Sequence, residues 1–274
     1  MKERIFSGAV LLIFLAAVVL FNDTAPFALH IAVAVIAALA VYELMKAMQV
    51  EKKWYLSIPS ILAAAGVSLT FEPLTIFAIY SIFAAIIFAG LIIKHKEISF
   101  KEIAVVLSMV TMIPLALRSL ISLRNLSESH GMFYVLIAIL AAWGSDAGAY
   151  FAGTFFGKRK LCPEISPKKT VEGFIGGVVT NIVIALLCGL IFTQTRQSQD
   201  VQVVYWVLAL IGLVGSLTSV LGDLSFSLIK RSCHIKDFGQ VIPGHGGVLD
   251  RFDSVIFTVP FVYLIVAVLP ILTA

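Results

Sequence analysis

The side chains that could carry chemistry are concentrated in one segment, Gly222–Asp253. The segment holds four carboxylates and four basic side chains, although only 13% of the chain is charged. Carboxylates and phosphate oxygens are the ligands that Mg²⁺ prefers, and cationic side chains bind phosphate. We therefore expect a phosphate-containing substrate and a divalent cation here. The charged residues are Asp223, Lys230, Arg231, Lys236, Asp237, Asp250, Arg251 and Asp253.

Three of these carboxylates are predicted to lie close together. Asp250 and Asp253 are three residues apart, so on a helix they share a face and could address one ion or a pair of ions. Asp223 ends the preceding apolar run at the same side of the membrane. A loop in which Asp and Lys or Arg only neutralise each other is the alternative, but it leaves the inserted Pro243–Gly247 stretch without a purpose.

Glycines and a histidine separate the charged residues of this segment. Gly244, Gly246 and Gly247 allow the backbone to approach a phosphate closely. His245 could bond a phosphate oxygen, assist proton transfer from an attacking phosphate, or brace the turn, and these three roles stay open.

A further carboxylate, Asp146, lies inside an apolar run, in the stretch Trp143–Tyr150. An ionised carboxylate in hydrocarbon is costly, so it is a candidate functional group by default. The alternative is a packing contact between helices, because Gly144, Ser145 and Gly148 would allow close approach.

The stretch Ser166–Gly173 combines Ser166, Pro167 and the adjacent lysines Lys168 and Lys169. Ser and Pro favour a helix start, and we expect a helix amino terminus that binds phosphate. The basic run Lys158–Lys160 is better explained by membrane topology or by contact with anionic lipid.

The rest of the chain must position these groups within a membrane. Its 274 residues are 60% hydrophobic with a mean hydropathy of +1.02, against about 45–50% apolar residues in soluble domains. Nine apolar runs are long enough to cross a bilayer, and we expect an all-α polytopic protein. The predicted spans are 5–21, 26–43, 54–71, 73–93, 102–123, 131–153, 173–193, 203–222 and 253–273.

The basic residues predict the topology. With nine spans, one side holds all of the 20 Lys and Arg residues except Arg118, Arg124 and Arg196. Basic residues concentrate in cytoplasmic loops, so the amino terminus is predicted to be cytoplasmic and the carboxyl terminus to be outside. A cleaved signal peptide in residues 1–21 is less favoured because the apolar run is long and no clear cleavage pattern follows.

The two halves of the chain differ in character. Residues 1–125 predict about five spans in a supporting role, and residues 126–274 predict a catalytic membrane region with cytoplasmic loops 154–172 and 223–252. The three cysteines are too far apart for a disulfide framework or a zinc site, and we interpret them as ordinary thiols.

The segment Ser227–Asp253 resembles the signature of a known protein family. Its residues match S-x-x-K-R-x4-K-D-x-G-x-x-x-P-G-H-G-G-x-x-D-R-x-D, the signature of CDP-diacylglycerol synthases (phosphatidate cytidylyltransferases), at every specified position. The stretches Trp143–Tyr150 and Ser166–Gly173 are also similar to this family. The resemblance covers roughly residues 141–254 and implies transfer of CMP from CTP to phosphatidic acid, releasing pyrophosphate.

The resemblance also implies roles for individual residues. The implied metal ligands are Asp146, Asp223, Asp250 and Asp253. Residues implied to act on the reacting groups are Lys230, Arg231, Asp237 and His245. Residues implied to bind substrate phosphates are Ser166, Lys168, Lys169, Gly246, Gly247 and Arg251.

The expected cofactor is Mg²⁺ or Mn²⁺, with a second cation left open. Expected partners are CTP, phosphatidic acid, the lipid bilayer and, as one arrangement, a second copy in a homodimer, with no nucleic acid. The expected location is a bacterial cytoplasmic (inner) membrane.

Other classes of protein stay open at this point. A transporter or channel would account for Asp146, but transport sites usually lie near the midplane. A CTP-dependent lipid kinase, or a cytidylyltransferase for an isoprenoid or ether lipid phosphate, would use much of the same chemistry. A scaffold that binds anionic lipid accounts for the basic loops but not for the carboxylates.

Overall fold

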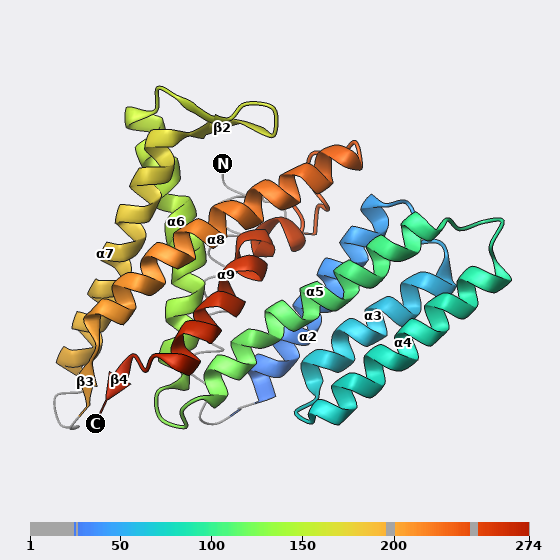
Figure 1. Ribbon diagram of the computed structural model, residues 1–274, viewed down its shortest axis with the longest axis horizontal. Coiled ribbons are helices and arrows are strands. Elements are labelled where there is room, and N and C mark those ends of the chain that lie inside the picture. Colours follow the sequence, from blue (N-terminus) through green and yellow to red (C-terminus); the bar gives the residue numbers. More distant parts are fainter. Residues whose placement is uncertain (1–24, 26, 196–200, 242–245, 274) are drawn as a thin grey trace. The chain divides into compact units, whose positions relative to one another are not determined.

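The computed structural model describes residues 25, 27–195, 201–241 and 246–273. Two compact units make up the chain (Figure 1). One contains the residues up to Arg118 together with Ser232–Phe252, and the other contains Ser119–Arg231 and Asp253–Ala274. Two helices, α5 and α9, therefore begin in the first unit and continue into the second.

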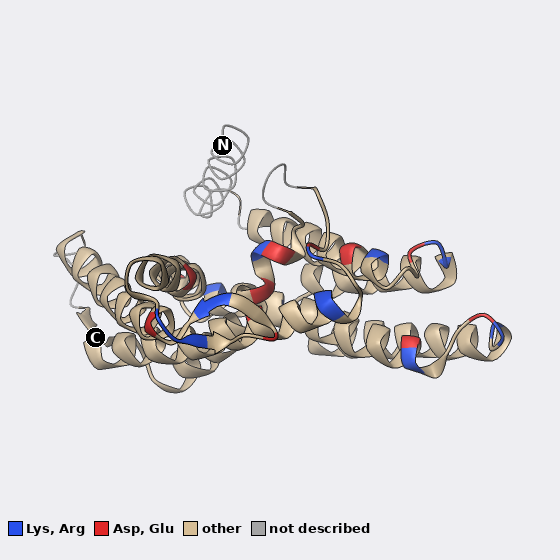
Figure 2. Ribbon diagram, turned by 90° about the horizontal axis from the view of Figure 1, so that it is seen from above, with Lys and Arg blue, Asp and Glu red and all other residues tan. Residues whose placement is uncertain are grey.

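Helices dominate the described part of the chain, as the apolar runs predict. They are α2 (Phe27–Ala47), α3 (Trp54–Leu69), α4 (Pro73–Ile93), α5 (Phe100–Asn125), α6 (Gly131–Phe156), α7 (Val171–Thr195), α8 (Tyr205–Ser232) and α9 (Leu249–Val268). Seven are long and apolar enough to cross a membrane, and α3 is an apolar helix of 16 residues. Figure 2 shows that charged positions form a few short groups on an otherwise uncharged ribbon.

The prediction of an all-α, multi-pass membrane protein is confirmed. Each predicted span from 26–43 onward corresponds to one described helix. The first predicted span, 5–21, lies outside the described residues, so the total of nine and the cytoplasmic amino terminus stay predictions.

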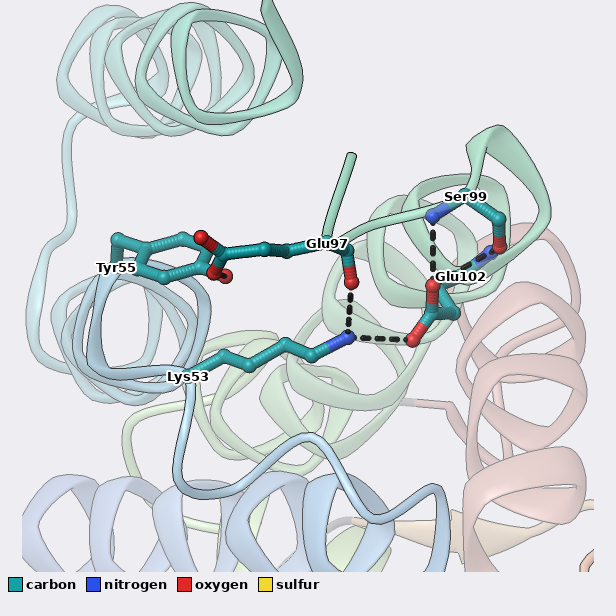
Figure 3. Close-up of polar contacts among 5 residues, drawn as sticks. All are labelled: Lys53, Tyr55, Glu97, Ser99 and Glu102. Atoms are coloured by element: carbon teal, nitrogen blue, oxygen red, sulfur yellow. Dashed lines mark hydrogen bonds and ion pairs between the residues drawn. The ribbon is translucent and has the colours of Figure 1, made fainter. Parts of the chain in front are cut away.

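In the first unit, α3 packs against both α2 and α4. A polar cluster joins the ends of α3, α4 and α5 (Figure 3). Lys53 Nζ donates to Glu102 Oε1 at 2.8 Å and to the Glu97 carbonyl at 3.0 Å. Glu102 also accepts the Ser99 N–H at 2.7 Å, and its own N–H donates to Ser99 Oγ at 3.2 Å. This reciprocal pair is a capping box that starts α5.

In the second unit, α6 and α7 pack closely along their length. A Cβ on Gly148 would lie 2.5 Å from Thr180 Cβ, and a Cβ on Gly177 would lie 2.9 Å from the Ser145 carbonyl. The small residues around Asp146 therefore allow close helix approach, as their sizes predict. The buried side chain of Asn181 on α7 donates hydrogen bonds to the carbonyls of Ala141 on α6 and Gly212 on α8. These bonds join α8 to the α6–α7 pair.

Short β pairs lie at the two ends of α7 (Figure 1). At one end β1 (Lys160–Cys162) pairs antiparallel with β2 (Ser166–Thr170). At the other end β3 (Gln202–Val203) pairs with β4 (Leu272–Thr273). The hairpin β1–β2 occupies most of the predicted loop 154–172.

The second predicted loop, 223–252, is much shorter in the structure. Helix α8 continues through Asp223 to Ser232, and α9 begins at Leu249 rather than at residue 253. No Gly or Pro interrupts the chain between Asp223 and Ser232, and Lys230 and Arg231 stabilise a helix carboxyl terminus. The polar residues after Gly222 thus mark the end of the apolar run, not the end of the helix.

Candidate active site

Three of the predicted carboxylates come together in the second unit. Asp146 lies on α6, Asp223 on α8 and Asp253 on α9, and all three interact electrostatically with one another. A close approach of α8 to α9 brings two of them together, since a Cβ on Gly222 would lie 2.7 Å from the Asp253 carbonyl. Three like charges in one place need cations or hydroxyl donors to stabilise them.

Both kinds of partner are present. Lys169 Nζ forms an ion pair with Asp223 Oδ2, and Lys230 Nζ lies 4.0 Å from Asp253 Oδ2. Asp146 Oδ1 accepts the Ser219 hydroxyl at 3.0 Å, and Asp146 also has a hydrogen bond with the side chain of Ser254. The structure therefore unites five predicted site residues in one polar cluster, which we call the Asp/Lys cluster: Asp146, Lys169, Asp223, Lys230 and Asp253.

The hairpin positions Lys169. On strand β2, Lys168 is exposed, whereas Lys169 is half-buried and reaches Asp223. The next residue, Thr170, starts α7, because its Oγ1 accepts the Gly173 N–H at 3.1 Å.

The expected helix start at Ser166 is wrong. Residues 166–170 form β2, and α7 begins at Val171. Pairing with β1 satisfies the backbone of this stretch, and a threonine, rather than Ser166, takes the capping position. Lys169 therefore reaches its partner from a strand, and the two lysines directly precede the amino terminus of α7 instead of forming its first turn.

Other predicted residues lie apart from the contacts of the Asp/Lys cluster. Ser166 is half-buried on β2, and Arg231 is exposed in the last turn of α8. Asp237 is exposed in the segment after α8. His245 lies outside the described residues. The roles implied for these residues, as for Lys168, stay predictions.

The remaining predicted residues belong to the first unit. Asp250 is buried in the first turn of α9, and its Oδ2 accepts the N–H groups of Phe238 at 2.8 Å and Gly247 at 3.0 Å. Gly246 has φ +90°, a conformation that favours glycine. Arg251 follows on α9 and is half-buried.

Sequence reasoning missed three residues that form hydrogen bonds with predicted site residues or with their immediate neighbours. Ser219 precedes Asp223 by four residues on α8, so helical spacing alone could have placed both on one face. Ser254 follows Asp253 directly. Glu43 is 1% exposed on α2, and its carboxylate accepts backbone N–H groups at the start of α9. The rule that singled out Asp146, a carboxylate in an apolar run, applies equally to Glu43.

The profile of the Cytidylyltransferase family matches residues 2–269. A phosphatidate cytidylyltransferase of Bacillus subtilis (strain 168) is 42% identical over 176 residues, which is 64% of this chain and 62% of that protein. The match thus spans less than two thirds of the Bacillus protein.

Two staphylococcal proteins match over a greater length. A phosphatidate cytidylyltransferase of Staphylococcus saprophyticus is 34% identical over 238 residues, 84% of this chain and 86% of that protein. One of Staphylococcus aureus (strain COL) is 32% identical over 239 residues, with the same shares. The match of the family profile over nearly the whole chain shows that this multi-pass membrane protein belongs to the cytidylyltransferase family and is a nucleotidyltransferase.

Proposed function

We propose that the protein is a phosphatidate cytidylyltransferase that makes CDP-diacylglycerol at the cytoplasmic face of a bacterial inner membrane. A phosphate oxygen of phosphatidic acid attacks the α-phosphorus of CTP and forms a new P–O bond. The bond from the α-phosphorus to the oxygen that bridges to the β-phosphorus breaks, and pyrophosphate leaves with that oxygen.

The Asp/Lys cluster is the observation that carries this proposal. Carboxylates and lysines from β2, α6, α8 and α9 meet in one place, and the three helices among these elements are largely apolar. Helices α6, α8 and α9 have the length and composition of membrane spans, as a lipid substrate requires. The relatives that share this sequence over most of its length carry the name of the same enzyme.

The lysines of the cluster have a direct role in this reaction. Lys169 and Lys230 each face a carboxylate in the structure, and both can exchange that partner for phosphate oxygens of CTP or of the lipid. Held in this way, the phosphate of phosphatidic acid and the α-phosphate of CTP lie in line for the displacement. The lysines then stabilise charge on the departing pyrophosphate.

The carboxylates fit a divalent cation of the Mg²⁺ or Mn²⁺ type. Among the described residues, no group of three His, Cys, Asp or Glu side chains is arranged to hold a metal by itself. Mg²⁺ is usually bound by one or two carboxylates, with substrate phosphates and water completing its shell. Asp223 and Asp253, with Asp146 beside them, supply such a set, and a metal-binding role for Asp250 stays a separate prediction. A bound cation would neutralise phosphate charge and stabilise the leaving group.

The proposal is tested with purified protein in detergent by following pyrophosphate release and lipid product from CTP and phosphatidic acid. The first variant is Asp223→Asn, which removes a charge from the centre of the cluster. Its matched control is Glu164→Gln, which removes an exposed acidic charge from the β1–β2 hairpin.

We expect Mg²⁺-dependent CDP-diacylglycerol formation by the parent protein and by Glu164→Gln, and a loss of about 100-fold or more in Asp223→Asn. A folded parent protein that gives no product with Mg²⁺ present would refute the substrate assignment. The mass of the detergent-solubilised particle, measured by light scattering, separately tests the expected homodimer.

A further inference from the structure

Two buried carboxylates hold the backbone of the segment that leads into α9. Glu43 on α2 accepts the N–H of Val248 at 3.0 Å through Oε1 and the N–H of Leu249 at 2.8 Å through Oε2. Asp250 Oδ2 accepts the N–H groups of Phe238 and Gly247. The consecutive N–H groups of Gly247, Val248 and Leu249 therefore all point to protein carboxylates.

The residue directly before α9 is apolar and offers no capping group. Val248 precedes the first helical residue, and valine cannot accept the orphan N–H groups as Ser, Thr, Asp or Asn would. Glu43 takes this role from a helix some two hundred residues earlier in the chain. Its negative charge also suits the positive end of the helix dipole. The start of α9 is thus fixed to α2, within one compact unit.

Glycines adapt the segment to Glu43. A Cβ on Gly247 would lie 2.5 Å from Glu43 Oε2, and a Cβ on Gly239 would collide with Glu43 Oε1. Both glycines belong to the stretch that carries Asp237 and Asp250. Their lack of a side chain allows both ends of residues 239–247 to pack on one carboxylate.

A buried carboxylate from a distant helix is a costly way to cap α9, unless the cap also has to fix the position of the segment before α9. A buried carboxylate in an apolar helix has to be stabilised by hydrogen bonds, whereas an Asp or Ser at position 248 would cap α9 locally at lower cost. What the remote cap adds is a fixed backbone for the residues immediately before Asp250 and Arg251. These two side chains extend from the first turn of α9 and are among the proposed metal and phosphate ligands.

We propose that Glu43 is a positioning residue for the reaction. By holding the N–H groups of Val248 and Leu249, it sets the direction in which Asp250 and Arg251 leave α9. This role rests on the proposed function, in which Asp250 and Arg251 bind the reacting groups. It also gives the amino-terminal helices a part in catalysis, and it leaves the first N–H groups of α9 to Glu43 rather than to a substrate phosphate.

The test compares Glu43→Gln with Glu102→Gln in the full-length protein. Both residues are carboxylates that accept backbone N–H groups at a helix start in the same unit, so Glu102→Gln is a matched control (Figure 3). Gln at position 43 keeps one acceptor and directs an N–H₂ group at a backbone N–H. Two quantities are measured: kcat and KM for CTP, and amide hydrogen exchange in the peptide that covers residues 236–252.

For Glu43→Gln we expect kcat to fall about 10-fold to 100-fold, the range for loss of a hydrogen bond to a charged group. KM for CTP should change less, because misplacement affects the transition state more than ground-state binding. Exchange at Val248 and Leu249 should accelerate about 10-fold or more on the same grounds. Glu102→Gln should leave kcat and this exchange unchanged.

A second pair of variants keeps the test decisive if Glu43→Gln does not fold. Gly239→Ala places a methyl group against the Glu43 carboxylate and should lower kcat. Adding Glu43→Asp withdraws the carboxylate by one methylene and should restore part of the activity. Losses that simply add in the double variant would contradict the proposal.

The failure of the positioning role can be distinguished from the failure of the proposed function. If the parent protein gives no CDP-diacylglycerol, the proposed function fails, and the exchange measurement still reports whether Glu43 holds the segment. Unchanged kcat and unchanged exchange in Glu43→Gln would overturn the positioning role. Equal losses of activity in Glu43→Gln and Glu102→Gln, following equal losses of stability, would reduce Glu43 to a structural cap.

Discussion

Replacing Lys169 by Gln, with Lys168→Gln as its control, tests the Asp/Lys cluster at one neighbouring pair of residues. The two lysines are adjacent on β2 and carry the same charge, but only Lys169 is half-buried and paired with Asp223. A role that depended on positive charge alone would affect both variants equally.

The expected magnitude follows from the contact that is lost. A hydrogen bond to a charged group contributes about 1.5–3 kcal/mol, and each 1.36 kcal/mol changes a rate tenfold. Lys169→Gln should therefore lower kcat/KM by about 10-fold to 150-fold. Lys168→Gln, at an exposed position, should change it less than about 3-fold, in line with the small contribution of exposed charges.

The assay is pyrophosphate release at saturating and limiting CTP, on variants whose thermal unfolding in detergent matches that of the parent protein. Equal losses in the two variants would show that the hairpin acts only through its net charge. Full activity in Lys169→Gln would refute the placement of Lys169 against a substrate phosphate.

Three further predictions concern metal, packing and pH. Chelation of divalent cations should abolish turnover and added Mg²⁺ should restore it, whereas turnover that persists in excess chelator would contradict the role given to the carboxylates. Gly148→Val should lower the unfolding temperature by about 2–10 °C, since its side chain meets Thr180 across α6 and α7, while the exposed neighbour Ala147→Val should change it little. Lys94 donates a hydrogen bond to Glu97 and holds the pKa of that carboxyl below its ordinary 4.5, so the stabilisation is present at neutral pH and is lost as the pH falls through the folded-state value. The difference in unfolding temperature between the parent protein and Glu97→Gln should accordingly disappear in acid. A difference that grew below pH 4 would contradict the predicted direction of this pH dependence.

The sequence predicts the helices well because their signal is one of length and apolarity. A run of about 20 apolar residues is needed to cross hydrocarbon, and this requirement depends on no distant contact. Helix ends were predicted less well. Asp223 looks like the start of a loop because it is polar, but α8 continues for nine residues beyond it, since polar residues can extend a helix past the membrane.

Much of the candidate site was also predictable from residue type. Asp146, Lys169, Asp223, Lys230 and Asp253 were all selected from the sequence, and the structure brings them together. What the sequence could not provide was the element that carries Lys169 or the partner of each charge. Glu43 could have been selected as a carboxylate in an apolar run, but its partners could not, because they are backbone N–H groups at the far end of the chain.

The central claim is that this chain transfers the cytidylyl group of CTP to phosphatidic acid. The most direct measurement supplies purified protein with CTP labelled with ³²P at either the α or the γ position, and then follows the label in the extracted lipid. The account predicts that α-label enters the lipid and that γ-label leaves as pyrophosphate. Transfer of γ-label to the lipid would identify a CTP-dependent lipid kinase instead, and no labelled lipid from either nucleotide would contradict the proposed reaction.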